Sequence, residues 1–83
     1  MNMTIHELKI LPEYFEPIES GKKKFEVRIN VRDYQVGDTL ILRCYHPVIE
    51  VYSSELECKV IYILNDERYT KSNYVIMLIE VVK

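Results

Sequence analysis

Short segments in which apolar and polar residues alternate are the feature that most constrains this fold. The clearest is 23–30, where Phe25, Val27 and Ile29 share one side and polar or charged residues occupy the other. The segment 56–64 repeats the same period of two. This period places successive side chains on opposite faces of a β-strand. The chain has no Ala but nine Val and ten Ile, a composition that favours strands over a helical bundle.

Three more segments predict strands: 5–11, 39–45 and 74–82. The first alternates weakly, and the last is apolar on both faces near its middle, as expected for a covered strand. The segment 46–54 has no clear period and contains Pro47, so we expect a mobile loop there. The other connections are predicted at 33–38, a turn with Gly37, and at 65–73, a polar stretch.

Residues 12–20 predict one short helix between the first two strands. Leu11, Phe15 and Ile18 are spaced by four and three, which forms a single apolar stripe. Pro12 suits the first turn of a helix, and Gly21 suits its end. Pro17 lies inside the segment and lacks the N–H that a helical hydrogen bond needs, so a kink or irregular turn is expected.

The predicted order is strand, helix and four strands in 83 residues. This length corresponds to one domain, 1–83. A sheet of about five short strands in so small a domain tends to curl closed, which removes exposed edges. The prediction is a mainly β (α+β) fold, a small β-barrel of about five mostly antiparallel strands with one short helix packed at an opening.

Charge is distributed unevenly along the chain. The formal net charge is −2, which argues against a protein that coats nucleic acid through bulk charge. Residues 20–45, however, hold six basic and three acidic groups, whereas the rest holds five basic and ten acidic. A basic segment of +3 on a body of −5 suits a small anionic ligand or a short stretch of nucleic acid. A solvated strand and turn is the alternative explanation.

The chain contains no apolar run of the ~20 residues that span a bilayer, and its N-terminus does not resemble a secretion signal. We therefore expect a cytoplasmic protein with no membrane partner, either a monomer or a weak homodimer. Two cysteines are too few for a disulfide scaffold. Cys44, His46, Cys58 and His6 lack the ligand spacing of structural zinc sites, so neither a metal nor a cofactor is predicted.

The segment Gly21-Lys22-Lys23-Lys24-Phe25-Glu26-Val27-Arg28 fits the pattern G-x-K-x-x-E-x-R. This pattern resembles the motif of the ASCH family in the PUA-like superfamily. Residues 8–14 resemble that family's first strand and helix, and residues 34–38 resemble the turn after the motif strand. The resemblance covers 5–42 well and points to a branch of small uncharacterised bacterial or phage proteins. It implies a PUA-like barrel whose cleft between barrel and helix binds RNA.

Some small ASCH members hydrolyse an acyl amide on a modified nucleoside. In those enzymes a Lys and a Thr three positions apart serve as activating group and nucleophile. The resemblance places the Lys at Lys23, but Glu26 stands at the Thr position. A carboxylate can act as a base for water but cannot replace a hydroxyl nucleophile. If the protein is an enzyme, Lys23 and Glu26 are its catalytic candidates, yet this departure favours a protein without catalysis.

The motif has its own chemistry, independent of the family. Glu26 and Arg28 are two apart on one strand, so their side chains share a face. Arg offers a planar fork of donors suited to phosphate or a base edge, and Glu26 can hold that fork in place. A cross-strand salt bridge on a solvated face is the structural alternative. The predicted ligand-binding residues are Lys9, Tyr14, Lys22, Lys23, Glu26, Arg28 and Arg32, and Tyr34 and Tyr45 also lie near the basic segment.

Three functions are consistent with the sequence. The first is an RNA- or nucleotide-binding module that uses these residues. The second is an amidohydrolase acting on an acylated modified nucleoside. The third is a structural or protein-interaction module, which predicts an exposed apolar patch or a stable dimer.

Overall fold

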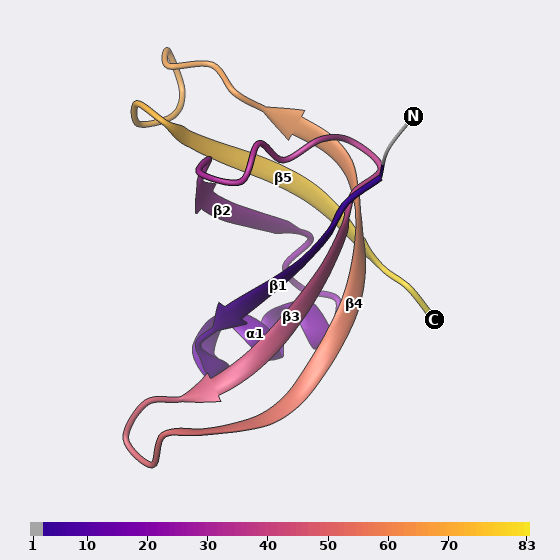
Figure 1. Cartoon of the computed structure of the whole chain (residues 1–83), viewed down its shortest axis with the longest axis vertical. Coiled ribbons are helices and arrows are strands. Elements are labelled where there is room, and N and C mark those ends of the chain that lie inside the picture. Colours follow the sequence, from indigo (N-terminus) through magenta and orange to yellow (C-terminus); the bar gives the residue numbers. More distant parts are fainter. Residues whose placement is uncertain (1–2) are drawn as a thin grey trace.

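One curved sheet with a single short helix at its side forms the protein (Figure 1). The computed structural model describes residues 3–83. The elements in chain order are β1 (Ile5–Ile10), α1 (Pro12–Glu19), β2 (Phe25–Ile29), β3 (Thr39–His46), β4 (Val51–Leu64) and β5 (Tyr74–Val81). Among residues 3–83 no helix is long and apolar enough to cross a membrane.

The strand order in the sheet is β1-β3-β4-β5-β2. β1 pairs with β3 in parallel, and the other three neighbouring pairs are antiparallel. The predicted fold class is therefore confirmed as a mainly β half-barrel of five mostly antiparallel strands with one helix. Two register shifts, between Arg43 and Tyr45 and between Val60 and Tyr62, accompany the bend of the sheet. β1 and β2 are its two edges, and no backbone ladder joins them within residues 3–83.

The prediction of a mobile loop at 46–54 is wrong. β3 ends at His46 and β4 begins at Val51, so the connection is the tight turn 47–50. Tyr45 pairs with Tyr52, and their ring centroids are 4.9 Å apart. This end of the hairpin lies largely in solvent, so burial imposes no alternation on its sequence. That is why a period of two is missing although the backbone is extended.

The helix ends as Gly21 predicts. Gly21 has φ +84°, and its N–H donates to the Ile18 carbonyl, while the N–H of Lys22 donates to Pro17. These two bonds form the Schellman arrangement that closes a helix C-terminus. α1 continues past Pro17 to Glu19, so the missing hydrogen bond does not end the helix. The apolar stripe is used as predicted, because Phe15 and Ile18 are its buried residues.

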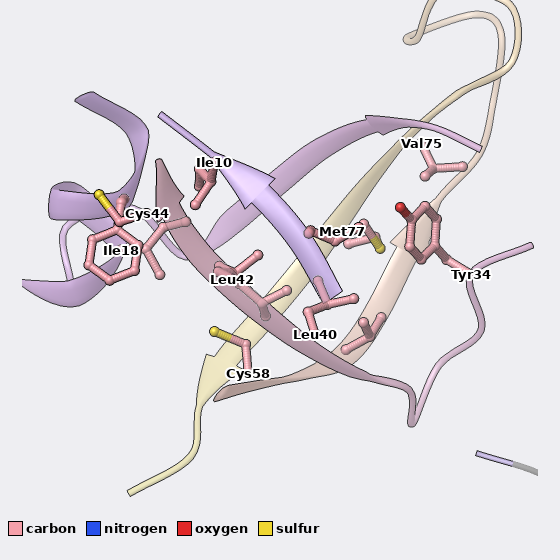
Figure 2. Packing of buried hydrophobic residues seen from close by; sticks show 13 residues of the cluster. Ile10, Ile18, Tyr34, Leu40, Leu42, Cys44, Cys58, Val75 and Met77 are labelled. Atoms are coloured by element: carbon pink, nitrogen blue, oxygen red, sulfur yellow. The ribbon is translucent and has the colours of Figure 1, made fainter. Parts of the chain in front are cut away.

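The concave side of the sheet holds the core. Figure 2 shows Ile18 and Cys44 together at the helix end, and Tyr34 beside Val75 at the opposite end. β3 and β4 supply the centre of the core. Its buried apolar residues are Leu8, Ile10, Phe15, Ile18, Tyr34, Leu40, Leu42, Cys44, Cys58, Val60, Val75, Met77 and Ile79.

A buried polar pair secures the turn before β3. Asp38 accepts hydrogen bonds from the backbone N–H groups of Thr4 and Gln35, and its Oδ2 lies 2.8 Å from His6 Nε2. Burial alone would raise the pKa of Asp38, but the hydrogen bonds from His6, Gln35 and Thr4 outweigh it and lower the pKa. The pair therefore attaches the turn to β1 through an ionised carboxylate.

Candidate functional site

β2 presents its charged side, not its apolar side, to the interior. Glu26 is only 4% exposed and Arg28 is half-buried. Phe25, Val27 and Ile29 are instead 45%, 46% and 48% exposed. Alternating strands usually turn the apolar side inward, so β2 is reversed relative to the rest of the sheet. The reversal places the motif carboxylate and guanidinium at the open side of the half-barrel.

Three motif residues form one charged cluster. Arg28 Nε donates to Glu26 Oε2 at 2.6 Å, and Lys23 Nζ lies 3.6 Å from Glu26 Oε1. The Glu26–Arg28 pair lies within one strand and on its inner side, so it is not a cross-strand bridge on a solvated face. Burying this carboxylate without partners would be costly, and two cations compensate for it.

Arg28 also joins the two edges of the sheet. Its Nη2 donates to the Lys9 carbonyl at 2.8 Å, across 19 residues of sequence. β1 and β2 are thus linked by a side chain at a place where no backbone ladder joins them. The guanidinium is fixed at both ends, by Glu26 and by β1, and still has free N–H donors because it carries five in all.

An open cleft lies along this seam between β1, β2 and α1. Its volume is about 990 Å³. Apolar side chains make part of its wall, and the charged cluster sits in it. Its polar and aromatic lining includes Tyr14, Lys23, Glu26, Arg28, Arg32 and Tyr34.

Six of the seven predicted ligand residues line the cleft, and five of them belong to it besides Lys9. These are Tyr14, Lys23, Glu26, Arg28 and Arg32. Lys9 lines the cleft too, but its ammonium group lies over the Tyr45 ring, 4.3 Å from the centroid, and its carbonyl is what holds Arg28. Lys22 is exposed after the helix and does not line the cleft.

Tyr34 is the cleft residue to which sequence reasoning gave too little weight. It is 5% exposed, lines the cleft, and its hydroxyl has no hydrogen-bond partner among residues 3–83. Burial raises the pKa of the phenol, and the nearby Arg28 and Arg32 act against that rise. The phenol therefore stays protonated, as a donor beside two guanidinium groups. The only signal in the sequence was its position six residues after Arg28.

The cysteine and histidine residues do not gather into a metal site. Within residues 3–83 there is no cluster of three or more His, Cys, Asp or Glu side chains that could hold an ion. Cys44 Sγ is 3.8 Å from His46 Nε2, which in turn is 2.8 Å from Ser53 Oγ. Cys58 is buried apart from them in the core, where burial raises the pKa of its thiol to about 11.

Comparison with known proteins places the chain in a family. Residues 5–79 match the family model described as a domain of unknown function, DUF3850. The chain belongs to the DUF3850 family. The matched range contains every residue that lines the cleft, so the cleft lies within the DUF3850 domain itself.

A phage protein is similar over part of the chain. The chain is 48% identical over 42 residues to an uncharacterized 12.9 kDa protein in the GpA 3′ region of Escherichia phage P2. The similar stretch is 51% of this DUF3850 chain and 38% of the phage protein. The chain thus matches well under two thirds of that relative's length.

Proposed function

We propose that the cleft binds RNA or a nucleotide-like ligand. The observation that carries the proposal is the meeting of Lys23, Arg28 and Arg32 with Tyr34 in one partly apolar cleft. Within residues 3–83 the Tyr34 hydroxyl has no hydrogen-bond partner. Such a site offers apolar surface to a flat base and several donors to phosphate oxygens. The resemblance of residues 21–28 to the ASCH motif of PUA-like proteins supports the same ligand class, and it leads us to expect action in the cytoplasm.

Within this proposal the cations have different tasks. Arg28 is preorganised, because Glu26 and the Lys9 carbonyl hold its guanidinium in one orientation. Arg32 is exposed and takes part in no ion pair within residues 3–83, so its fork is free for a phosphate. Tyr34 adds a neutral donor near both, since both guanidinium groups act on the pKa of its phenol. The phosphate would lie at this end of the cleft.

The other end of the cleft suits a base or ribose. Lys23 Nζ lies 5.1 Å from the centroid of the Tyr14 ring, and Tyr14 is exposed at the cleft. An aromatic ring beside a cation can stack on a nucleobase, which contributes ~1–3 kcal/mol in single-strand binders. The two ends together favour a ligand with a planar apolar part and an anionic part.

Amidohydrolysis of an acylated nucleoside remains the second candidate, because Lys23 and Glu26 do lie together in the cleft. Both oxygens of Glu26, however, face cations, one from Lys23 and one from Arg28. A carboxylate held in this way is better suited to orienting Arg28 than to activating water. The geometry therefore favours binding over hydrolysis.

Fluorescence anisotropy with labelled single-stranded RNA, with nucleoside monophosphates as competitors, tests the proposal. Arg32→Ala should weaken binding roughly tenfold or more, since a charge-assisted hydrogen bond is worth about 1.5–3 kcal/mol. Binding should also fall as salt rises. Lys22→Ala is the matched control, because Lys22 is an exposed cation outside the cleft.

Equal loss of affinity in both variants would mean that binding depends on general charge and not on the cleft. Absence of RNA binding at low salt would contradict the proposed function. Chromatography of acetylated cytidine incubated with the protein tests the second candidate. Turnover that disappears in Lys23→Ala would favour the hydrolase.

A further inference from the structure

The outer face of the sheet is apolar over β2, the first part of β5 and the last part of β4. Strand register sets Phe25 opposite Leu78, which lies opposite Tyr62. The next row is Val27, Ile76 and Leu64, and a third pairs Ile29 with Tyr74. Ile61, at the register shift in β4, is also exposed. We call these nine residues the apolar face, and it contains no charged side chain.

The apolar face is as extensive as the largest apolar patches on typical monomers. Leu78 is 42% exposed and Tyr62 is 60% exposed, similar to the three β2 residues. With about 150–250 Å² for a whole aromatic side chain and somewhat less for an aliphatic one, these fractions leave on the order of 600 Å² of apolar surface. The largest patch on a typical monomer is about 300–600 Å², and each partner of a standard interface buries about 800 Å². An isolated chain would leave almost a whole interface in water.

Lys71 and Glu80, at the two ends of the apolar face, are opposite in sign, and Lys59 is the cross-strand neighbour of Glu80. Lys71 lies just before β5 and lines a small hollow with Val27, Tyr69 and Ile76. Glu80 lies at the other end of β5, two residues beyond Leu78. Neither takes part in an ion pair within the residues that the structure describes, 3–83. Two such faces turned head to tail would set each Glu80 near a Lys71.

We propose that the apolar face binds a second copy of this chain through a two-fold axis, with β5 crossing its counterpart in the opposite direction. In a two-fold interface both subunits use the same surface patch, so each contact between two different residues occurs twice. The uncharged rows meet in the centre, and the Glu80–Lys71 contacts at the rim select the antiparallel orientation. Phe25, Val27, Ile29 and Tyr74 of the apolar face also line the cleft. Leu78 and Tyr62 do not, so changes at these two residues test the interface without altering the cleft.

Sedimentation velocity and light scattering after size exclusion, across a range of protein concentrations, test the dimer. The parent should become dimeric as concentration rises, and Leu78→Lys should stay monomeric because it places a charge in the centre. Tyr62→Lys is a second variant in case the first fails to fold, and neither residue lines the cleft. Val48→Lys is the control, since Val48 is 94% exposed in the turn 47–50, away from the apolar face.

A charge exchange tests the orientation. Glu80→Lys and Lys71→Glu should each weaken the dimer, and the double variant should restore it. A parent that stays monomeric at every concentration overturns the proposal, as does a dimer that both Leu78→Lys and Tyr62→Lys leave intact. Open-ended assembly into larger species would overturn the two-fold arrangement. RNA binding is measured on the same samples, so failure of the dimer and failure of the cleft are seen separately.

Discussion

The two halves of the sheet's outer surface differ in chemistry although one backbone pattern builds both. Over β1, β3 and β4 the exposed rows carry charge: Lys9 lies opposite Arg43, which lies opposite Glu55 and 3.6 Å from its carboxylate. Over β2, β5 and the end of β4 the rows are apolar, with Phe25, Leu78 and Tyr62 in line. A solvated face explains the first half. The second half lacks such an explanation and is the reason for proposing a partner.

The cleft arises from the orientation of β2 in the sheet. β2 is the strand whose charged side turns inward, and this reversal places its apolar side outward. Glu26 and Arg28 of the cluster and Phe25, Val27 and Ile29 of the apolar face therefore lie on opposite sides of one five-residue strand. The ligand chemistry of residues 21–28 accounts for the inner side of β2 only, and the outer side needs a separate explanation.

The largest expected effect concerns the core that both halves share. Leu42→Ala removes a fully buried side chain from the middle of β3 and should lower the free energy of unfolding by about 2–5 kcal/mol. Urea denaturation followed by circular dichroism and by tyrosine fluorescence should give one coincident transition. Two separate transitions would mean that the charged and apolar halves are independent units. Val48→Ala, at the exposed turn, should change stability little.

The next effect concerns the seam where the two edges meet. Arg28→Lys keeps the charge but loses the fork that reaches both Glu26 and the Lys9 carbonyl, so stability should fall by about 1.5–3 kcal/mol. Hydrogen exchange at β2 should rise more than at β3. Lys24→Arg, on an exposed cation in the same segment, is the control. Unchanged exchange at β2 in Arg28→Lys would show that the link does not hold the seam.

A smaller effect, dependent on pH, concerns the charged half. The pKa of Asp38 is lower in the folded protein than in the unfolded chain, so the unfolded chain binds more protons in acid. The contribution to stability is therefore complete above the unfolded pKa of about 3.9 and is lost as pH falls through the folded pKa.

Asp38→Asn should lower stability by about 1–2 kcal/mol at neutral pH and flatten this acid dependence, measured by urea denaturation at several pH values. Asp66→Asn is the matched control, because the pKa of Asp66 is also lowered, by Arg68, but in an exposed pair. An acid slope that persists in Asp38→Asn would assign it to other groups.

Most of the secondary structure could be predicted from the sequence, because the helix and most strands follow from patterns among neighbouring residues. The period of two predicted β1, β2 and the body of β4, and the Gly21 stop predicted the end of α1. The end of the β3–β4 hairpin could not be predicted, since neither face of it is buried and no periodic pattern is imposed. In the candidate site, Lys23, Glu26 and Arg28 could be grouped by spacing alone, whereas Tyr34 could not.

By itself the sequence determined which residues of β2 share a face and which charges sit in one segment, since both depend on neighbours along the chain. Only the tertiary structure decided which face turns inward. An alternating strand has two faces, and its place at the edge of a curved sheet, with Arg28 reaching a carbonyl 19 residues away, selects between them. That selection depends on contacts between distant segments, which no local pattern specifies, and it created both the cleft and the apolar face.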